Sequence, residues 1–264
     1  MPELAEVEYF RKQWDGGIGQ RITRVAVHGT SRIFRGSEPE AMECTLRGST
    51  FLNSEARGKQ IVFRFSKDAW LGVHLGMTGK LHTAAKDFIV GRHDHLVLFQ
   101  ARRALVFSDP RMFGRIRFHR GKDAPTWWTG LPPAVNSREF TVAKLRAILR
   151  RRARAPLKAL LLMQEFFPGI GNWMADEILW QARLHPGVLA GTLDEAAIRL
   201  LWRVARYVCR VAIKTIGVDW GDPPDNWLIH QRWGKAGRCP RDRASLSFAT
   251  IGGRTTAFCP RCQK

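Results

Sequence analysis

The stretch PGIGNWMADE at residues 168–177 lies between two segments with helical periodicity. Before it, Pro156 opens a pattern of spaced leucines in residues 157–161, and after it a second apolar period runs from Asn172 to Arg183. Proline suits the first turn of a helix, and leucines three or four residues apart share one helix face. Glycines let the backbone approach closely, and the amides that start the following helix favour an anion. We therefore predict two helices joined by a tight glycine turn.

Outward from this turn, the chain is helical on the C-terminal side and strand-like on the N-terminal side. Apolar residues recur at helical spacing from Phe140 to about Thr215. Upstream, a single helix precedes segments with the alternation or short apolar runs of strands, at 60–65, 71–75, 96–99, 105–107 and 115–119. We predict an α+β protein with an N-terminal helix, an antiparallel β-sandwich and a C-terminal helical domain.

The expected domain boundaries follow from this change of period. Residues 1–125 form the β-sandwich domain, and 126–138, with Gly130, Pro132 and Pro133, form a linker. Residues 139–222 form the helical domain. The segment 227–264 is short of helix signals and rich in glycine and arginine, so we expect a small appended finger there.

The charge balance points to a partner made of phosphates. The 264 residues contain 43 Lys and Arg against 23 Asp and Glu, a net charge of +20. RNA-binding, ribosomal and DNA-repair proteins all fit this excess, and the dense run at 150–154 is either a solvated helix face or a phosphate contact. No apolar run approaches the roughly 20 residues of a membrane helix, and no secretory signal pattern is present. We expect a cytoplasmic (nucleoid) or nuclear protein that is not secreted.

Three of the five cysteines cluster near the end of the chain, at Cys239, Cys259 and Cys262. An odd number of cysteines with one cluster fits a metal-type site in a reducing compartment better than a disulfide framework.

Three separated motifs together resemble the formamidopyrimidine-DNA glycosylase and endonuclease VIII family of bifunctional repair enzymes. They are PELAEVE at 2–8, PGIGN at 168–172 and GRTTAFCPRC at 253–262. The resemblance spans the whole chain in the family's motif order, although Ala5 stands where the family usually has proline. It implies a helix–two-turns–helix motif in the helical domain and a β-hairpin finger of zinc type at the end.

Pro2 becomes a nucleophile once Met1 is removed, because its secondary α-amine titrates near neutrality, at about 7.7–8.0. The resemblance assigns it attack on the sugar C1′, loss of the damaged base and strand nicking by β,δ-elimination through a Schiff base. It assigns Glu3 protonation of the opening sugar ring and Glu6 organisation of the site. Taken alone, a second-position proline signals only easy methionine removal.

The resemblance also implies a set of DNA contacts. Lys59 reaches the phosphate and ribose around the lesion, while Met77, Arg111 and Phe113 enter the base stack, with Met112 where a second arginine is usual. Asn172 and nearby amides, and Arg254 at the hairpin tip, hold phosphates; His74, beside the Met77 turn, is a further contact. Taken alone, Lys59 suits a strand edge, Met77 and Phe113 suit a core, and Asn172 suits a helix cap.

The finger departs from the family pattern of two C-x-x-C pairs, because the first pair here reads CPRD at 239–242. Zinc accepts carboxylate oxygen as well as sulfur, so we predict a structural zinc held by Cys239, Asp242, Cys259 and Cys262. The alternative is a hairpin without metal. The catalysis itself needs no cofactor.

The resemblance is closer to the formamidopyrimidine branch, which implies damaged double-stranded DNA as the partner of a monomer. The expected lesions are formamidopyrimidines and further-oxidised guanines, with weaker excision of 8-oxoguanine, because the segment VDWGDPPDN at 218–226 is shorter than the loop with which bacterial members grip 8-oxoguanine. Two alternatives remain: an oxidised-pyrimidine glycosylase of the endonuclease VIII type, and a non-catalytic protein that binds damaged DNA.

Overall fold

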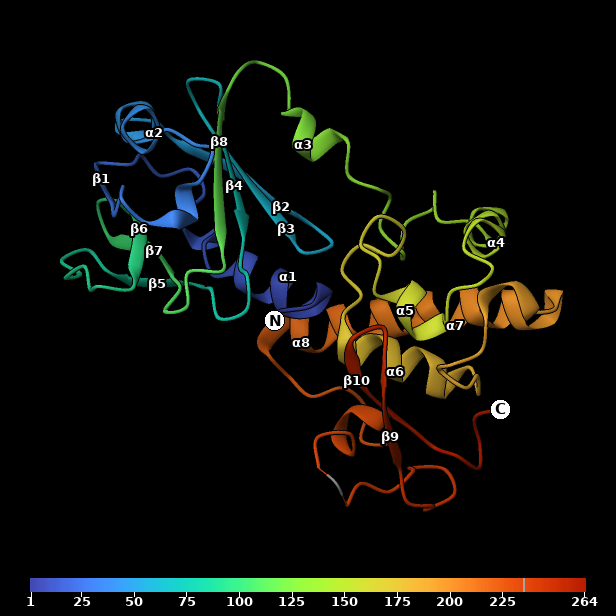
Figure 1. The fold of residues 1–264 in the computed structure, drawn as a ribbon. Helices are drawn as coiled ribbons and strands as arrows, with labels where there is room; N and C mark the ends of the chain where they lie inside the picture. Colours follow the sequence, from blue (N-terminus) through green and yellow to red (C-terminus); the bar gives the residue numbers. More distant parts are fainter. Residues whose placement is uncertain (235) are drawn as a thin grey trace. The chain divides into compact units, whose positions relative to one another are not determined.

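The chain forms two compact units in a computed structural model that describes residues 1–234 and 236–264. The first unit contains Met1–Pro2 and Glu6–Leu131, and the second contains Glu3–Ala5 and Pro132–Lys264 (Figure 1). The division therefore falls inside helix α1 (Leu4–Lys12), whose first residues group with the C-terminal half. The domain boundaries expected from the sequence stay predictions.

The first unit is built on two four-stranded antiparallel sheets. One sheet has the order β1 (Arg24–Val27), β6 (Asp94–Phe99), β7 (Arg103–Ser108), β5 (Lys80–Ala85). The other has the order β2 (Phe51–Arg57), β3 (Gln60–Phe65), β4 (Ala69–His74), β8 (Arg115–Arg120). The shorter elements of this unit are η1 (Asp15–Gly17), η2 (Arg32–Phe34), α2 (Pro39–Leu46) and α3 (Thr126–Thr129).

A hydrophobic core joins these two sheets into the predicted sandwich. Phe63 and Leu71 from one sheet and Leu98 and Phe107 from the other are fully buried in one cluster, together with Trp14. Alternation along each strand turns every second side chain inward, which is why residues 60–65 read apolar at alternate positions. The sandwich fold predicted from the sequence is confirmed.

The second unit is helical and ends in a two-stranded hairpin. Its elements are α4 (Val142–Arg151), α5 (Leu157–Leu161), α6 (Asn172–Gln181), η3 (Ala190–Thr192), α7 (Glu195–Lys214), α8 (Ile216–Asp219), η4 (Leu228–His230), β9 (Ser247–Ile251) and β10 (Arg254–Phe258). The helices before and after the glycine turn and the C-terminal hairpin are confirmed. In the described part of the chain, no helix has the length and apolar character needed to cross a bilayer.

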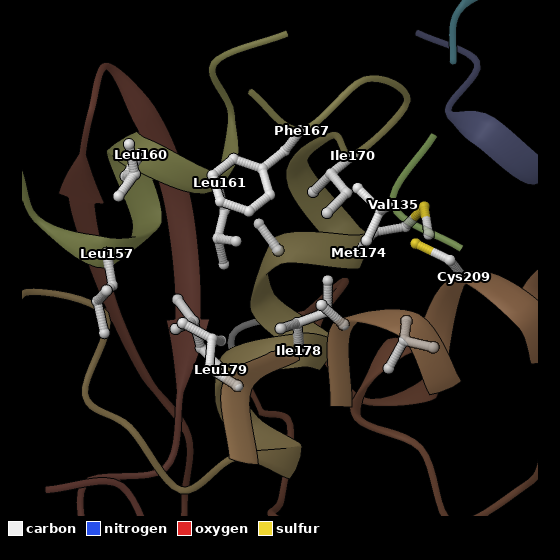
Figure 2. Close-up of a cluster of buried hydrophobic side chains, with 14 of the residues drawn as sticks. Val135, Leu157, Leu160, Leu161, Phe167, Ile170, Met174, Ile178, Leu179 and Cys209 are labelled. Carbon is white, nitrogen blue, oxygen red and sulfur yellow. The ribbon is translucent and has the colours of Figure 1, made fainter. Parts of the chain in front are cut away.

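Helix α6 lies at the centre of the second unit's core. Figure 2 shows Met174, Ile178 and Leu179 of α6 among side chains from neighbouring segments, including Leu161 of α5 and Cys209 of α7. Residues 173–180 are all buried, so this helix has no solvent-facing side over most of its length. An all-round buried helix is a rigid support for the residues at its ends.

The strands that sequence patterning missed are short or carry mainly polar side chains. Strand β1 has four residues, and β2 reads FLNSEAR, with mainly polar side chains that remain partly accessible to solvent. Their pairing is decided by partners distant in the chain, such as Val25 opposite Leu98, rather than by local alternation.

Candidate functional site

The Glu3 carboxylate is almost fully buried and accepts three backbone hydrogen bonds at the start of α6. Its Oε2 accepts from the amides of Gly171 at 2.9 Å and Met174 at 3.1 Å, and its Oε1 accepts from the Trp173 amide at 3.0 Å. The free amides and the dipole of a helix N-terminus both favour negative charge. The anion at this helix start is thus the chain's own carboxylate. These three amides donate to Glu3, so they are not the amides that the sequence analysis expected to hold phosphates.

Two glycines make this arrangement possible. Gly169 has φ +93°, a left-handed conformation that disfavours other residues, and its carbonyl accepts from the Leu4 amide at 3.0 Å. A β-carbon on Gly171 would overlap the Glu3 carboxyl group. The PGIGN motif is therefore the sequence requirement for holding residues 3 and 4 against the start of α6.

Pro2 directly precedes the anchored Glu3, so an amine at Pro2 is joined to the held residue by a single peptide link. Pro2 and Glu6 are both half-buried. Lys59 is half-buried in the two-residue turn between β2 and β3, after Gly58, whose φ is +62°. A positive φ is what a two-residue hairpin turn requires, so the glycine fixes where Lys59 leaves the sheet.

His74, the last residue of β4, is held as a neutral imidazole. Its Nδ1 accepts a hydrogen bond from the Gly76 amide at 3.1 Å, which leaves the ring proton on Nε2. Burial, and then the positive charges of Lys59, Arg117 and Arg35, lower the pKa of His74 to about 4. The ring is therefore a hydrogen-bond donor through Nε2 without carrying a charge at neutral pH.

Asp109 holds together the two turns that carry Met77 and Phe113. It is fully buried, and its Oδ1 accepts from the Thr78 hydroxyl at 2.6 Å and the Arg111 amide at 3.3 Å. Its Oδ2 accepts from the Gly114 amide at 2.7 Å. The two turns also touch directly, because a β-carbon on Gly76 would overlap the Phe113 backbone.

The tips of these turns expose large apolar side chains. Met77 is 41% exposed and Phe113 is 42% exposed. The Arg111 and Arg32 guanidinium groups lie 4.8 and 5.1 Å from the Phe113 ring centre. Met112, between Arg111 and Phe113, has φ +53°, and its carbonyl accepts from Arg32 Nε at 2.9 Å. Exposed apolar wedges on rigid turns are suited to entering a base stack.

Asn172, the first residue of α6, contacts the C-terminal hairpin. Its Nδ2 donates to the Thr255 carbonyl at 2.9 Å, while its Oδ1 is buried with no hydrogen-bond partner in the structure. Arg254 is exposed at the start of β10, after the two-glycine turn at 252–253, where φ is +61° and +72°. Asn172 and Arg254 thus belong to one helix–hairpin assembly in the second unit.

A buried ionic network fixes this hairpin to α6. Asp176 accepts from Lys158 Nζ through Oδ1, and from Arg232 Nη2 at 2.7 Å and the Ala257 amide at 3.1 Å through Oδ2. Lys158 also donates to the Asn172 carbonyl at 2.7 Å. Burial lowers the pKa of Lys158, against the opposing effect of Asp176. Removing one partner from such a network costs several kcal/mol because it leaves a buried charge uncompensated.

Four side chains of the finger are arranged as a candidate metal centre. The ligand atoms of Cys239, Asp242, Cys259 and Cys262 all lie within 4.8 Å of one another. Cys239 Sγ is 3.7 Å from Cys262 Sγ, and Cys259 Sγ is 3.5 Å from Asp242 Oδ2. Metal–sulfur bonds of about 2.3 Å in a tetrahedron put neighbouring ligands about 3.8 Å apart. This group could therefore hold a metal ion.

Comparison with known proteins assigns the chain to a family. Residues 1–116 match the family model of the formamidopyrimidine-DNA glycosylase N-terminal domain, and residues 131–220 match that of the formamidopyrimidine-DNA glycosylase H2TH domain. A formamidopyrimidine-DNA glycosylase of Solibacter usitatus is 33% identical, with 100% of both chains covered. The chain belongs to the formamidopyrimidine-DNA glycosylase family.

Other members of the family agree in sequence and in fold. A formamidopyrimidine-DNA glycosylase of Arabidopsis thaliana is 29% identical over 100% of this chain and 71% of its own length. The Lactococcus lactis enzyme bound non-covalently to DNA containing an AP site is 30% identical, with a TM-score of 0.87 over 99% of both chains. The same enzyme with DNA containing an oxidised pyrimidine gives 0.88 over 100% of both. The family resemblance predicted from the three motifs is confirmed.

Sequence patterning missed the residues that support the family's motifs. Asp109 had no predicted role in the sequence analysis, and the Lys158–Asp176–Arg232 network was not predicted. A signal existed for two of them, because Lys158 and Asp176 are charged residues in largely apolar helical patterns, where a charge is rarely buried unless it is paired. The third partner, Arg232, lies in a segment without such a pattern.

The substitution Asp109→Asn is expected to lower the free energy of unfolding by about 2–3 kcal/mol. The Asn side chain would place its NH₂ donor opposite an N–H or O–H group that donates to a carboxylate oxygen in the wild type. Two donors cannot form a hydrogen bond with each other. Urea unfolding measures the effect, and Asp87→Asn, an exposed residue of the same unit, is the control and should change stability by less than about 0.5 kcal/mol. Equal costs for the two variants would show that Asp109 does not hold the turns.

The substitution His74→Gln is expected to reduce the acid sensitivity of the fold. Between the folded pKa of about 4 and an unfolded pKa of about 6.5, the unfolded chain binds a proton that the folded chain does not. Stability therefore falls as pH falls through this window. Urea unfolding at pH 7 and pH 4.5 should show the wild type losing about 2 kcal/mol more than His74→Gln. Identical losses would contradict a neutral, half-buried His74.

Proposed function

We propose that this protein is a bifunctional DNA glycosylase and AP lyase of base excision repair, acting as a monomer on damaged duplex DNA. The observation that carries the proposal is the anchoring of Glu3 to the start of α6, which holds the residue that follows Pro2. Membership of the formamidopyrimidine-DNA glycosylase family supports the reaction type. Such an enzyme works where the DNA is, in a cytoplasmic nucleoid or a nucleus.

The reaction begins with the unprotonated Pro2 amine, which forms a bond to the sugar C1′ as the bond from C1′ to the damaged base breaks. The Glu3 carboxylate takes the N–H proton that Pro2 loses on attack and passes it to the ring oxygen as the sugar opens, and an iminium forms between Pro2 and C1′. This electron sink acidifies the C2′ proton. Loss of that proton expels the 3′ phosphate, a second elimination expels the 5′ phosphate, and water then releases the amine.

The remaining predicted residues position the DNA in this proposal. Lys59 and neutral His74 bind phosphates near the lesion, and Glu6 organises the site. Arg111 faces the base left without its partner while Met77 and Phe113 occupy the stack, and Asn172 and Arg254 hold the lesion strand. Extruding a damaged base from the duplex costs less free energy than extruding an intact, paired base, and this difference favours recognition of lesions.

Borohydride trapping tests the lyase. Protein with Met1 removed should give a covalent adduct with a duplex that contains an abasic site, and Pro2→Gly should reduce the adduct at least tenfold because a secondary amine is lost. Glu3→Gln should keep DNA binding but slow base excision. A correctly processed wild-type protein that binds the duplex without forming an adduct would favour the alternative of a non-catalytic damage-binding protein.

A strand-nicking assay on matched duplexes that carry different lesions discriminates among them. The segment between α8 and η4 is short, so we propose a preference for formamidopyrimidines, further-oxidised guanines and abasic sites over 8-oxoguanine. The expected kcat/KM is about tenfold higher for a formamidopyrimidine, which corresponds to about 1.4 kcal/mol. Equal or faster 8-oxoguanine excision contradicts this preference, and faster excision of oxidised pyrimidines favours the endonuclease VIII alternative.

We also propose that Cys239, Asp242, Cys259 and Cys262 hold a structural zinc, with no part in the chemistry. Purified protein should contain about one zinc per chain, and Asp242→Ala should lose it at chelator concentrations that leave the wild type loaded. Asp225→Ala, an exposed residue of the same unit, is the control. A well-folded wild-type chain without zinc would establish the alternative of a metal-free hairpin.

A further inference from the structure

A pocket of about 220 Å³ lies on the β2–β3–β4–β8 sheet, on the face opposite the sandwich core. We call it the arginine pocket; its lining residues are Arg35, Gln60, Gly72, His74, Phe113, Arg115 and Arg117. The sheet register gathers them, because His74 pairs with both Gln60 and Arg115, and Gly72 pairs with Arg117. Side chains two residues apart point to the same face, so Arg115 and Arg117 enter the pocket together.

Gly72 and Trp127 shape the pocket. A β-carbon on Gly72 would overlap the Trp127 ring, so a glycine is needed for this ring to lie against the strand. The Arg117 guanidinium lies 5.6 Å from the Trp127 ring centre. Such a stack orients a guanidinium group without neutralising its charge.

The positive charges of the pocket have no acidic partner. Among residues 1–234 and 236–264, Arg35, Arg115 and Arg117 form no salt bridge, and the lining contains no carboxylate. Arg35 Nη1 donates to the Gly114 carbonyl at 3.1 Å, and Arg115 Nε is buried without a hydrogen-bond partner. Burial, and then the charges of Arg115 and Arg35, lower the pKa of Arg117. A bound anion would relieve both the repulsion and the unsatisfied donor.

The size and chemistry of the pocket select the ligand. Small-molecule sites occupy roughly 300–1,000 Å³, so this pocket suits a single compact group rather than a nucleobase. Guanidinium groups bind phosphate oxygens through paired N–H donors, and neutral His74 faces the same pocket. The exposed Phe113 forms part of its rim, and the chain carries a net charge of +20.

We propose that the arginine pocket binds one backbone phosphate of duplex DNA through Arg115 and Arg117, with Arg35 as a third cation. This phosphate lies beside the part of the DNA strand that Phe113 wedges apart. The pocket therefore extends the DNA contact beyond the exposed turn that carries Phe113. The identity of the occupant as DNA rests on the proposed function, whereas the capacity for a phosphate group does not.

The double variant Arg115→Gln/Arg117→Gln tests the pocket through the salt dependence of binding. The probe is a duplex with a tetrahydrofuran residue in place of the lesion. Loss of one phosphate contact should reduce the slope of log affinity against log salt by about 0.9 and lower affinity about tenfold at low salt. Arg115→Lys/Arg117→Lys should keep the slope. The control Arg120→Gln, on the same strand but outside the pocket, should leave both unchanged.

Two further measurements separate the possible outcomes. Borohydride trapping at saturating protein is a separate readout of the lyase: a double variant that still traps and keeps the wild-type salt slope overturns the pocket and leaves the lyase intact. A wild type that fails to trap overturns the lyase, while a reduced slope in the double variant still supports the pocket. If inorganic phosphate binds the wild type and not the variant, yet the DNA slope is unchanged, the site takes free phosphate and the DNA assignment is wrong. If the double variant unfolds, Arg115→Gln alone should lower the slope, and an unchanged slope would overturn the proposal.

Discussion

The contact between the Glu3 carboxylate and the first amides of α6 is the interaction on which the candidate site depends. Hydrogen bonds to a charged group contribute roughly 1.5–3 kcal/mol each, and here three converge on one buried carboxylate. They take the place of a side-chain cap at Gly171, which α6 lacks. A chain end is ordinarily the most mobile part of a domain. This contact anchors residue 3 and so limits the positions that Pro2 can occupy.

The same helix organises the rest of the second unit. Residues 173–180 are buried, so α6 cannot rotate or shift without opening the core drawn in Figure 2. Asp176 receives Lys158, Arg232 and the Ala257 amide, and thereby fixes the hairpin that carries Arg254. The charged network costs desolvation energy that an apolar replacement would not, but it specifies one geometry for the finger against the helix. Contacts of this kind, behind the residues that would touch a ligand, hold a binding site to a fraction of an ångström.

The first unit reaches a similar result with different means. Asp109 satisfies the donors of two neighbouring turns and lets Met77 and Phe113 remain exposed on a rigid base. Exposed apolar side chains give up the stabilisation of burial, so their retention on supported turns fits a role in contact with another molecule. His74 lines up with Arg115 and Arg117 of the adjacent strand because antiparallel register brings their positions together, although His74 is distant from them in the chain.

The sequence by itself determined the class of the fold, the family and the residues whose groups are suited to chemistry or binding. Periodicity separated strands from helices because local alternation and helical spacing are properties of the chain alone. Motifs identified Pro2, Glu3, Asn172 and Arg254 because their neighbours in sequence are informative. Only the tertiary structure decided what those residues contact. Glu3 meets the start of α6 across 168 positions, Asp109 joins two turns, and Lys158, Asp176 and Arg232 meet in the core. The reason is physical: a buried charge must be satisfied by whichever groups the fold brings within hydrogen-bond distance, and sequence spacing does not contain that distance.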